Sequence, residues 1–284
     1  MKILITGANG YLGRGVVKQL INDGYDVIAT DLNDDTIDRR ATIKKADIFA
    51  LEDPFDYFEK PDILLHMAWR DGFSHNSSSH VDDLPKHFKF ISSMVENGIK
   101  KVCVLGSMHE IGFFEGSINE NTPTNPESLY GISKNALRKM TELLCKKNNI
   151  RYQWLRGFYI VGNSEKGSSI FAKIVQAENK GKETFPFTSG KNQYDFVDYD
   201  EFCEQVAAIV EQNNVLGIIN CCSGHPVSLA TRVENFISEN NFKIKLAYGT
   251  FPDRPYDSKA IWGNNDKIIQ IMKERKNDKK SFIK

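Results

Sequence analysis

Short apolar runs alternate with helix-like patterns from the first residue of the chain. The runs that are short enough for buried strands cover residues 2–6, 26–30, 42–43, 62–66, 101–105 and 152–156. Apolar residues recur with a helical period over 11–23, 82–97 and 128–147. Strands separated by helices of this length form parallel βαβ units with right-handed crossovers. The pattern therefore predicts an α/β fold, a doubly wound parallel sheet of the Rossmann type.

The order is looser after residue 156. We predict helices over 168–179, 199–212 and 228–239, strands over 194–197 and 217–221, an edge strand over 243–247, and a fraying, charge-dense tail from residue 273. We therefore divide the chain into a Rossmann domain, 1–161, and a mixed region, 162–284. In the mixed region a small C-terminal lobe is interleaved with the last Rossmann elements, 198–222. We expect the lobe to cover the carboxyl edge of the sheet, where open α/β sheets bind their ligands.

Composition narrows the class of protein. The 284 residues contain 37 Lys and Arg and 37 Asp and Glu, a formal net charge of zero that disfavours nucleic-acid and membrane-surface binding. No run approaches the ~18 apolar residues of a membrane-spanning helix, and Met1 leads straight into a strand, so we expect a cytoplasmic protein. The sequence has no CxxC or HxxxH spacing, so we expect no metal site. The five cysteines are therefore expected to be buried free thiols: Cys103, Cys145, Cys203, Cys221 and Cys222.

The segment "ILITGANGYLGRGVV" places Gly7, Gly10 and Gly13 between the first strand and the first helix. Gly7 permits a sharp turn, Gly10 lets a pyrophosphate approach the backbone, and Gly13 lets helix and strand pack closely. Asp31 ends the second strand, 24 residues after Gly7, where a carboxylate accepts hydrogen bonds from the adenosine ribose. We therefore expect residues 1–161 to bind NAD(P). NAD is preferred and NADP is the second choice, because Asp31 repels a 2′-phosphate. The alternative is a Rossmann fold that has lost its ligand.

The GxxGxxG spacing resembles the extended short-chain dehydrogenases/reductases, the NAD-dependent epimerase/dehydratase family that modifies nucleotide sugars. Most of the chain carries further matches: "KADIF", "LLHMAW", "ENTPTNPESLYGISK", "LRGFYIVG" and "QYDFVDYDEF". The resemblance implies a nucleotide-sugar substrate, a substrate-binding role for the small lobe, and a homodimer through residues 82–97 and the helix that carries Tyr130. It also implies further cofactor-binding residues beside the glycines and Asp31: Asn9, Tyr11, Leu12, Leu32, Asp47, Ile48, Met67, Ala68, Trp69, Tyr130 and Lys134.

Tyr130 and Lys134 are spaced i, i+4 on a predicted helix, so both project from one face. A free phenol has a pKa near ~10, and a neighbouring ammonium and a positively charged nicotinamide favour the phenolate and lower that pKa. We expect Tyr130 to exchange a proton with the substrate oxygen and Lys134 to support it. Ser107 stands where the family keeps a hydroxyl that hydrogen-bonds the reacting oxygen. The alternatives are a surface Tyr–Lys pair and a hydroxyl that only ends the strand.

Met108 and His109 occupy the positions where sugar dehydratases of this superfamily carry an Asp–Glu pair. Methionine donates no proton, so 4,6-dehydration is disfavoured. His109 is a candidate substrate contact or auxiliary acid, and the alternative is a structural histidine; the role of Glu110 is not predicted.

The segment that follows "LLHMA" departs from the family's small, apolar pattern. Arg70 is a candidate for a substrate carboxylate or phosphate and Trp69 for stacking on a ring; the alternative is a solvated polar loop. Arg254 is a candidate for the substrate diphosphate, because a guanidinium holds phosphate oxygens in two hydrogen bonds. His80 and His87 lack a third partner for a metal.

The resemblance leaves three functions to weigh. A nucleotide-sugar 4-ketoreductase of the dTDP-4-dehydro-6-deoxyhexose type and a 4-epimerase using bound NAD share the Ser–Tyr–Lys set. A non-catalytic dinucleotide-binding scaffold would be expected to lack it. We favour the reductase because the chain resembles such reductases in length and is shorter than typical epimerases. The sugar and the nucleotide are not assigned.

Overall fold

The structure is a computed structural model of the 284-residue chain and describes residues 1–162, 165, 169–253 and 258–281. Its centre is a seven-stranded sheet of order β11-β7-β5-β4-β1-β2-β3, in which every neighbouring pair is parallel. The strands are β1 (Lys2–Thr6), β2 (Asp26–Thr30), β3 (Thr42–Ile43), β4 (Ile63–His66), β5 (Lys101–Ser107), β7 (Arg151–Gly157) and β11 (Gly217–Cys221). The predicted doubly wound α/β fold is confirmed.

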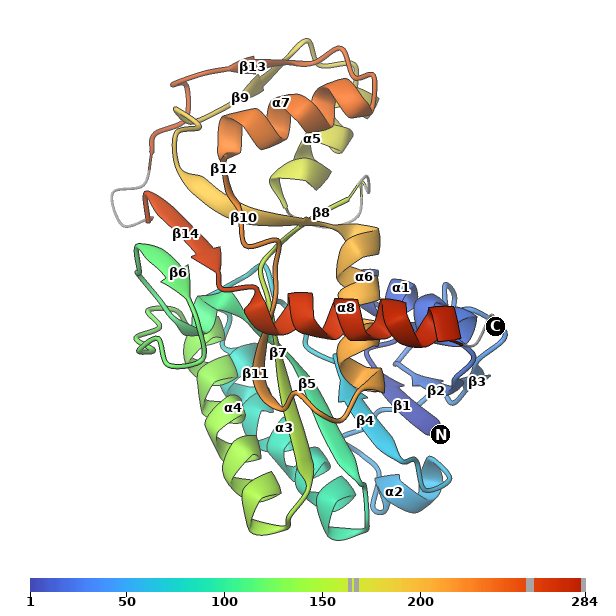
Figure 1. Ribbon diagram of the computed structural model, residues 1–284. Coiled ribbons are helices and arrows are strands. Elements are labelled where there is room, and N and C mark those ends of the chain that lie inside the picture. Colours follow the sequence, from blue (N-terminus) through green and yellow to red (C-terminus); the bar gives the residue numbers. More distant parts are fainter. Residues whose placement is uncertain (163–164, 166–168, 254–257, 282–284) are drawn as a thin grey trace.

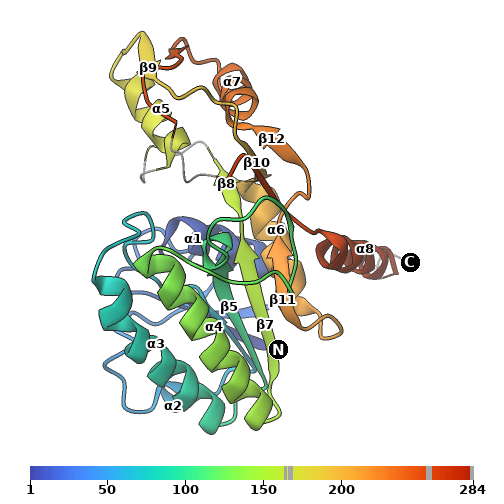
Figure 2. The same ribbon diagram turned by 90° about the vertical axis from the view of Figure 1, so that its left-hand side faces the viewer.

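Helices cover both faces of this sheet. Figure 2 shows α3 and α4 on one side of the strands and α6 and α8 on the other. Side chains alternate along β1 accordingly: Ile3 packs with the α1, α6 and α8 side, and Leu4 with the α3 and α4 side. The helices are α1 (Tyr11–Asn22), the short α2 (Pro54–Tyr57), α3 (Ser79–Glu96), α4 (Leu129–Lys147), α6 (Tyr199–Glu211) and α8 (Asp266–Ser281).

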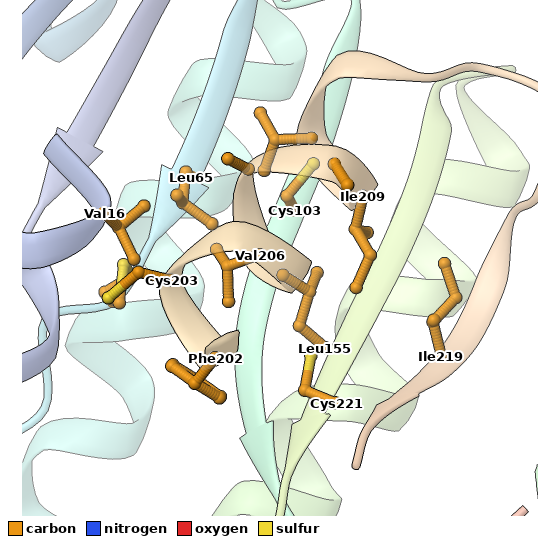
Figure 3. Packing of buried hydrophobic residues seen from close by; sticks show 14 of the residues in the cluster. Val16, Leu65, Cys103, Leu155, Phe202, Cys203, Val206, Ile209, Ile219 and Cys221 are labelled. Atoms are coloured by element: carbon orange, nitrogen blue, oxygen red, sulfur yellow. The ribbon is translucent and has the colours of Figure 1, made fainter. Parts of the chain in front are cut away.

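The core between α6 and the sheet is mainly apolar (Figure 3), and its buried polar side chains Lys101, Gln153 and Gln205 donate to backbone carbonyls. Phe202 and Val206 of α6 are both 0% exposed and pack against Leu155 of β7 and Leu65 of β4. All five cysteines are free and buried, as expected, and burial raises the pKa of each thiol. Cys103, Cys203 and Cys221 serve this core as small apolar side chains.

A second group of elements lies beyond the carboxyl edge of the central sheet (Figure 1). One sheet has the order β12-β10-β14-β6, with β8 paired to β10, and a two-stranded sheet joins β13 to β9. These strands are β6 (Gly116–Ile118), β8 (Tyr159–Val161), β9 (Thr184–Pro186), β10 (Gln193–Asp198), β12 (Pro226–Ser228), β13 (Lys245–Ala247) and β14 (Ala260–Gly263). Two helices, α5 (Ile170–Asn179) and α7 (Leu229–Glu239), share an apolar core with them. Among the described residues, no helix is long and apolar enough to cross a membrane.

One buried carboxylate joins three parts of this second sheet. Asp195 of β10 is 0% exposed and accepts the backbone N–H groups of Ser223, Gly224 and Gly263 at 2.8, 2.9 and 3.0 Å. Because a buried carboxylate requires such donors, Asp195 fixes the segment after β11 and the end of β14 against β10.

The predicted fraying tail from residue 273 is wrong as far as the structure describes it, because α8 runs without a break to Ser281. Arg275 is 7% exposed. Its guanidinium forms ion pairs with Asp23, just after α1, and with Glu211, at the end of α6. A charge-dense segment lies in solvent only when its charged side chains find no partners elsewhere in the protein. Here the partners are more than 60 residues away in the chain.

Candidate active site

The turn between β1 and α1 is tight. Gly7 has φ +72°, and a Cβ atom there would lie 2.7 Å from the backbone nitrogen of Ala68. A Cβ atom at Gly13 would lie 2.0 Å from the carbonyl oxygen of Gly7. The roles predicted for Gly7 and Gly13, the sharp turn and the close packing of helix and strand, are therefore confirmed.

The start of α1 suits an anion. Gly10 is its exposed N-cap, the first turn carries no acidic residue, and among the described residues no side chain caps this end. The backbone N–H groups of Tyr11, Leu12 and Gly13 therefore begin the helix beside the glycine turn. This is the arrangement that holds a pyrophosphate at a Rossmann helix.

A carboxylate lies beside the same turn. Oδ2 of Asp31 accepts the backbone N–H of Asn9 at 2.9 Å, and Oδ1 accepts that of Leu32 at 2.7 Å. The Ala46 N–H donates to the Asp31 carbonyl at 3.1 Å, which brings the exposed Asp47 and the buried Ile48 close to this position. The residues present fit a dinucleotide: open helix donors for its phosphates and an acceptor at the end of β2 for a ribose hydroxyl.

Met67 and Ala68 close the other side of the turn. Their backbone N–H groups both donate to the hydroxyl of Thr6, at 3.2 and 3.3 Å, which places them directly over Gly7. The segment after β4 thus lies directly against the glycine turn.

The fold brings Ser107, Tyr130 and Lys134 together. Ser107 ends β5, and Tyr130 and Lys134 lie one turn apart at the start of α4, whose first turn is capped by the Ser128 hydroxyl. The Ser107 side chain lies beside the Tyr130 phenol and lowers the pKa of that phenol. Nζ of Lys134 donates to the carbonyl oxygen of Leu105 at 2.9 Å. A hydroxyl, a phenol and an ammonium therefore meet at the carboxyl edge of the sheet.

Burial has the largest effect on the pKa values of Tyr130 and Lys134. It raises the pKa of Tyr130 to about 12; the Ser107 side chain lowers that pKa and the charge of Glu110 raises it. Burial also lowers the pKa of Lys134 to about 7. The expectation that Lys134 draws the Tyr130 pKa down is wrong for the protein's own groups, because burial has the largest effect on this pKa and raises it.

Glu110 holds Ser107 in place. Its side chain is 0% exposed, and Oε1 accepts the Ser107 backbone N–H at 2.7 Å and the Trp154 indole N–H at 2.8 Å. Oε2 lies 3.5 Å from the Arg156 guanidinium and 3.6 Å from that of Arg138. Sequence reasoning left Glu110 without a role, although Ser107-x-x-Glu110 is the capping-box pattern that the structure forms at the short helix Met108–Glu110.

Two histidines flank Tyr130. The His75 ring stacks on the phenol at 5.3 Å and 12°, and the His75 carbonyl accepts the Tyr130 backbone N–H at 2.8 Å. The His109 ring lies 4.5 Å from His75 and 6.0 Å from Tyr130. Burial, then His75, lowers the pKa of His109 to about 4, so His109 is a neutral group. His109 was predicted as a site candidate, whereas the role of His75 was not predictable, because the loop that carries it has the pattern of a polar connection.

Three more residues were predicted as substrate or cofactor contacts: Arg70, Trp69 and Arg254. The Arg70 guanidinium, on a side chain that is 61% exposed, pairs with the buried carboxylate of Asp83. Trp69 packs beside Lys134 and donates its indole N–H to Nδ1 of His80 at 3.1 Å. Arg254 lies outside the described residues. Within the part of the chain that the structure describes, no group of three or more His, Cys, Asp or Glu side chains could hold a metal ion.

A Rossmann sheet, an open helix terminus beside the carboxylate at the end of β2, and a Ser–Tyr–Lys set at the sheet edge are typical of the short-chain class of dinucleotide-dependent oxidoreductases. The chain belongs to the NAD dependent epimerase/dehydratase family, whose model matches residues 3–222. It is therefore an enzyme of an NAD-dependent family. When bound, NAD supplies or accepts a hydride.

The chain is similar to characterised relatives over nearly its full length. It is 46% identical over 270 residues to a dTDP-6-deoxy-L-talose 4-dehydrogenase (NAD(+)) from Aggregatibacter actinomycetemcomitans, covering 93% of this chain and 99% of the relative. It is 27% identical to a UDP-glucose 4-epimerase from Lactobacillus helveticus, covering 96% and 91%.

Solved structures share the fold. A UDP-glucose 4-epimerase from Thermotoga maritima with UDP-glucose has a TM-score of 0.81 at 20% identity, covering 95% of this chain and 92% of that one. A UDP-glucuronic acid 4-epimerase from Bacillus cereus, in complex with UDP-glucuronic acid and NAD, has a TM-score of 0.79 at 18% identity, covering 96% and 93%. At this identity the likeness shows the fold alone.

Proposed function

We propose that this enzyme transfers a hydride between NAD and C4 of a nucleotide-activated 6-deoxyhexose, and that in the reductive direction it is a dTDP-4-dehydro-6-deoxyhexose reductase. The observation that carries the proposal is the meeting of Ser107, Tyr130 and Lys134 at the end of β5. A relative with 46% identity is named for the same bond, the C4 carbinol of a dTDP-6-deoxyhexose.

Each of the three residues has one role in this proposal. The Ser107 hydroxyl donates a hydrogen bond to the C4 oxygen and orients it. The Tyr130 phenol gives its proton to that oxygen during reduction and takes a proton back during oxidation. We assign Lys134, one turn from Tyr130 on α4, the role of stabilising the phenolate by its charge, because burial, which raises the Tyr130 pKa to about 12, opposes the phenolate.

The residues beside Ser107 argue against loss of water from the sugar. Met108 is 5% exposed and apolar, and His109 is neutral, with a pKa of about 4. Dehydration needs an acid for the leaving hydroxyl and a base for a carbon-bound proton. His109 and His75 instead offer neutral imidazole contacts to the sugar, and Arg70 and Arg254 remain candidates for the charged part of the substrate.

Asp31 supports NAD over NADP. Its two oxygens already accept the N–H groups of Asn9 and Leu32, so the carboxylate is fixed at the end of β2. A ribose 2′-phosphate placed there would meet a fixed negative charge. We therefore propose NAD(H) as the working cofactor.

The test uses the purified full chain with NADH or NADPH and the C4 ketone of dTDP-6-deoxy-L-talose, while the absorbance of the reduced nicotinamide is followed. The proposal expects one cofactor oxidised for each sugar reduced, with NADH at least about tenfold better than NADPH in kcat/KM. The reverse reaction should reduce NAD with the dTDP-6-deoxyhexose product. Interconversion of UDP-hexoses without net cofactor oxidation, together with tightly retained NAD, would instead make the enzyme a 4-epimerase.

A further inference from the structure

The ammonium of Lys134 lies between a carbonyl group and an aromatic ring. Nζ donates to the Leu105 carbonyl at 2.9 Å and lies 3.9 Å from the centroid of the Trp69 ring. Lys134 is 4% exposed, so water does little to stabilise its charge. A desolvated cation over the face of an indole is attracted by the ring quadrupole, and Trp is the best residue for this contact.

The Trp69 ring is itself held on two sides. Its N–H donates to Nδ1 of His80 at 3.1 Å, and Nε2 of His80 lies 3.1 Å from the carbonyl oxygen of Ser74. A carbonyl only accepts, so Nε2 of His80 carries the proton and Nδ1 is free to accept from the indole. The His87 ring stacks on the Trp69 ring at 4.5 Å and 11°, which prevents the indole from tilting away from the lysine.

A chain of hydrogen bonds fixes His87. The Thr6 hydroxyl accepts two backbone N–H groups and therefore donates its own proton to Nδ1 of His66 at 2.8 Å. Nε2 of His66 then donates to Nδ1 of His87 at 2.8 Å. Both imidazoles are consequently neutral, and burial keeps the pKa of each well below 6.5. The His66–His87 pair behind the Trp69 indole therefore carries no positive charge that would repel Lys134.

We propose that Trp69 is a positioning residue for Lys134: its indole face, fixed by His80 and by the buried His66–His87 pair, holds the lysine ammonium in its charged form beside Tyr130. This role goes beyond the cofactor contact that the sequence suggests for position 69. It rests on the proposed function, since it assigns Lys134 to the same proton transfer.

The groups that face Lys134 can be named from each neighbouring element. Tyr130 lies one turn earlier on α4, His66 belongs to β4 and His87 to α3, and Glu110 lies in the short helix after β5. Burial lowers the pKa of Lys134 to about 7 and Glu110 raises it. The charged and neutral forms are therefore close in energy near neutrality, and loss of the indole face should shift the balance measurably.

The experiment follows the titration of Lys134 by NMR in the full chain produced with ¹³Cε-labelled lysine; the signal is assigned with Lys134→Arg. Trp69→Leu keeps an apolar side chain but removes the π face, and Trp69→Phe keeps a weaker one. Phe73→Leu removes an aromatic ring that is 66% exposed in the loop between β4 and α3 and serves as the matched control.

We expect the Lys134 midpoint to fall by about one pH unit or more in Trp69→Leu and by about half as much in Trp69→Phe, with no change in Phe73→Leu. If the Trp69 ring only fills space, the Lys134 midpoint should rise instead, because the shorter side chain admits water that stabilises the ammonium. A rise, or a midpoint within a few tenths of the wild-type value, overturns the proposal. If Trp69→Leu does not fold, an unchanged midpoint in Trp69→Phe overturns it as well.

Turnover gives a second readout. In Trp69→Phe the loss of kcat should be larger at about pH 8 than at about pH 6, because more of the lysine is neutral at the higher pH. A structural defect alone lowers kcat equally at both. The NMR titration needs no substrate, so a shifted midpoint in an enzyme that reduces no 4-keto sugar would refute the proposed function and leave the pairing of Trp69 with Lys134 intact.

Discussion

The backbone N–H of Ser107 donates to Oε1 of Glu110 at 2.7 Å, and the same oxygen accepts the indole N–H of Trp154 at 2.8 Å. A carboxylate that is fully buried thus links the end of β5 to β7 and fixes the residue whose hydroxyl reaches Tyr130. The site and the core of the sheet are joined through this one side chain.

Glu110→Ala should destabilise the protein by about 3–5 kcal/mol, because it leaves the Arg156 guanidinium buried without its carboxylate and Arg138 with only the exposed Glu142. Chemical denaturation measures this loss. Glu96→Ala, at the exposed end of α3, is the control and should change stability by less than about 0.5 kcal/mol. Equal, small effects in both variants would refute the anchoring role.

Asp31→Asn should weaken NAD binding about tenfold and NADP binding much less, because the fixed charge at the end of β2 is removed while the side chain keeps its size. Calorimetric titration with each dinucleotide checks this. The exposed Asp35→Asn serves as the matched control. If both dinucleotides lose affinity equally, Asp31 does not discriminate between them.

Acid should destabilise the protein through its buried neutral histidines. Burial holds the pKa of His66 well below 6.5, that of His87 at about 3 and that of His109 at about 4, whereas the unfolded chain protonates each near 6.5. The folded pKa values are lowered, so this stability is fully present above pH 6.5. It is lost as the pH falls toward the folded values.

The expected slope between pH 6.5 and about 4 is up to about 1.4 kcal/mol per pH unit for each of these histidines. Urea denaturation at a series of pH values measures it. His109→Gln should flatten the slope, and His225→Gln, at an exposed position, should leave it unchanged. Equal slopes in wild type and His109→Gln would contradict the neutral state of His109.

Arg275→Ala should cost about 3 kcal/mol, because Asp23, whose side chain is 7% exposed, loses its buried partner. Lys276→Ala, one residue later and exposed, should be nearly neutral. Thermal unfolding of the two variants compares them directly. A loss no greater than that of Lys276→Ala would show that α8 is held by its apolar face alone.

Most of the helices and strands could be predicted from the local pattern of apolar and polar residues. The central strands have a clear period, and the edge strand predicted over 243–247 appears at Lys245–Ala247. The three- and four-residue strands β6, β8, β9, β12 and β14 were not predicted, since they depend on partners from distant parts of the chain. The same reason explains α8, whose buried Arg275 finds its carboxylates only in three dimensions.

The candidate site likewise has residues that the sequence predicted and contacts that it did not. The spacing of Gly7, Gly13, Tyr130 and Lys134 was readable because each depends on one turn or one helix. The stacking of His75 on Tyr130 was not, because loop 70–78, which carries His75, gives no periodic signal. The stacking of His87 on Trp69 was not either, because it joins α3 to the segment after β4 only in three dimensions. The Tyr130 pKa was misjudged because a sequence shows the charged neighbour but not the depth of burial.

The central claim is that Tyr130 exchanges the proton at the sugar C4 oxygen. The most direct measurement compares Tyr130→Phe with the wild type in two respects: turnover of NADH with the C4 ketone of dTDP-6-deoxy-L-talose, and the dissociation constant of NAD. We expect kcat to fall at least about a hundredfold while the NAD dissociation constant changes less than about threefold. Wild-type turnover in Tyr130→Phe would contradict the account.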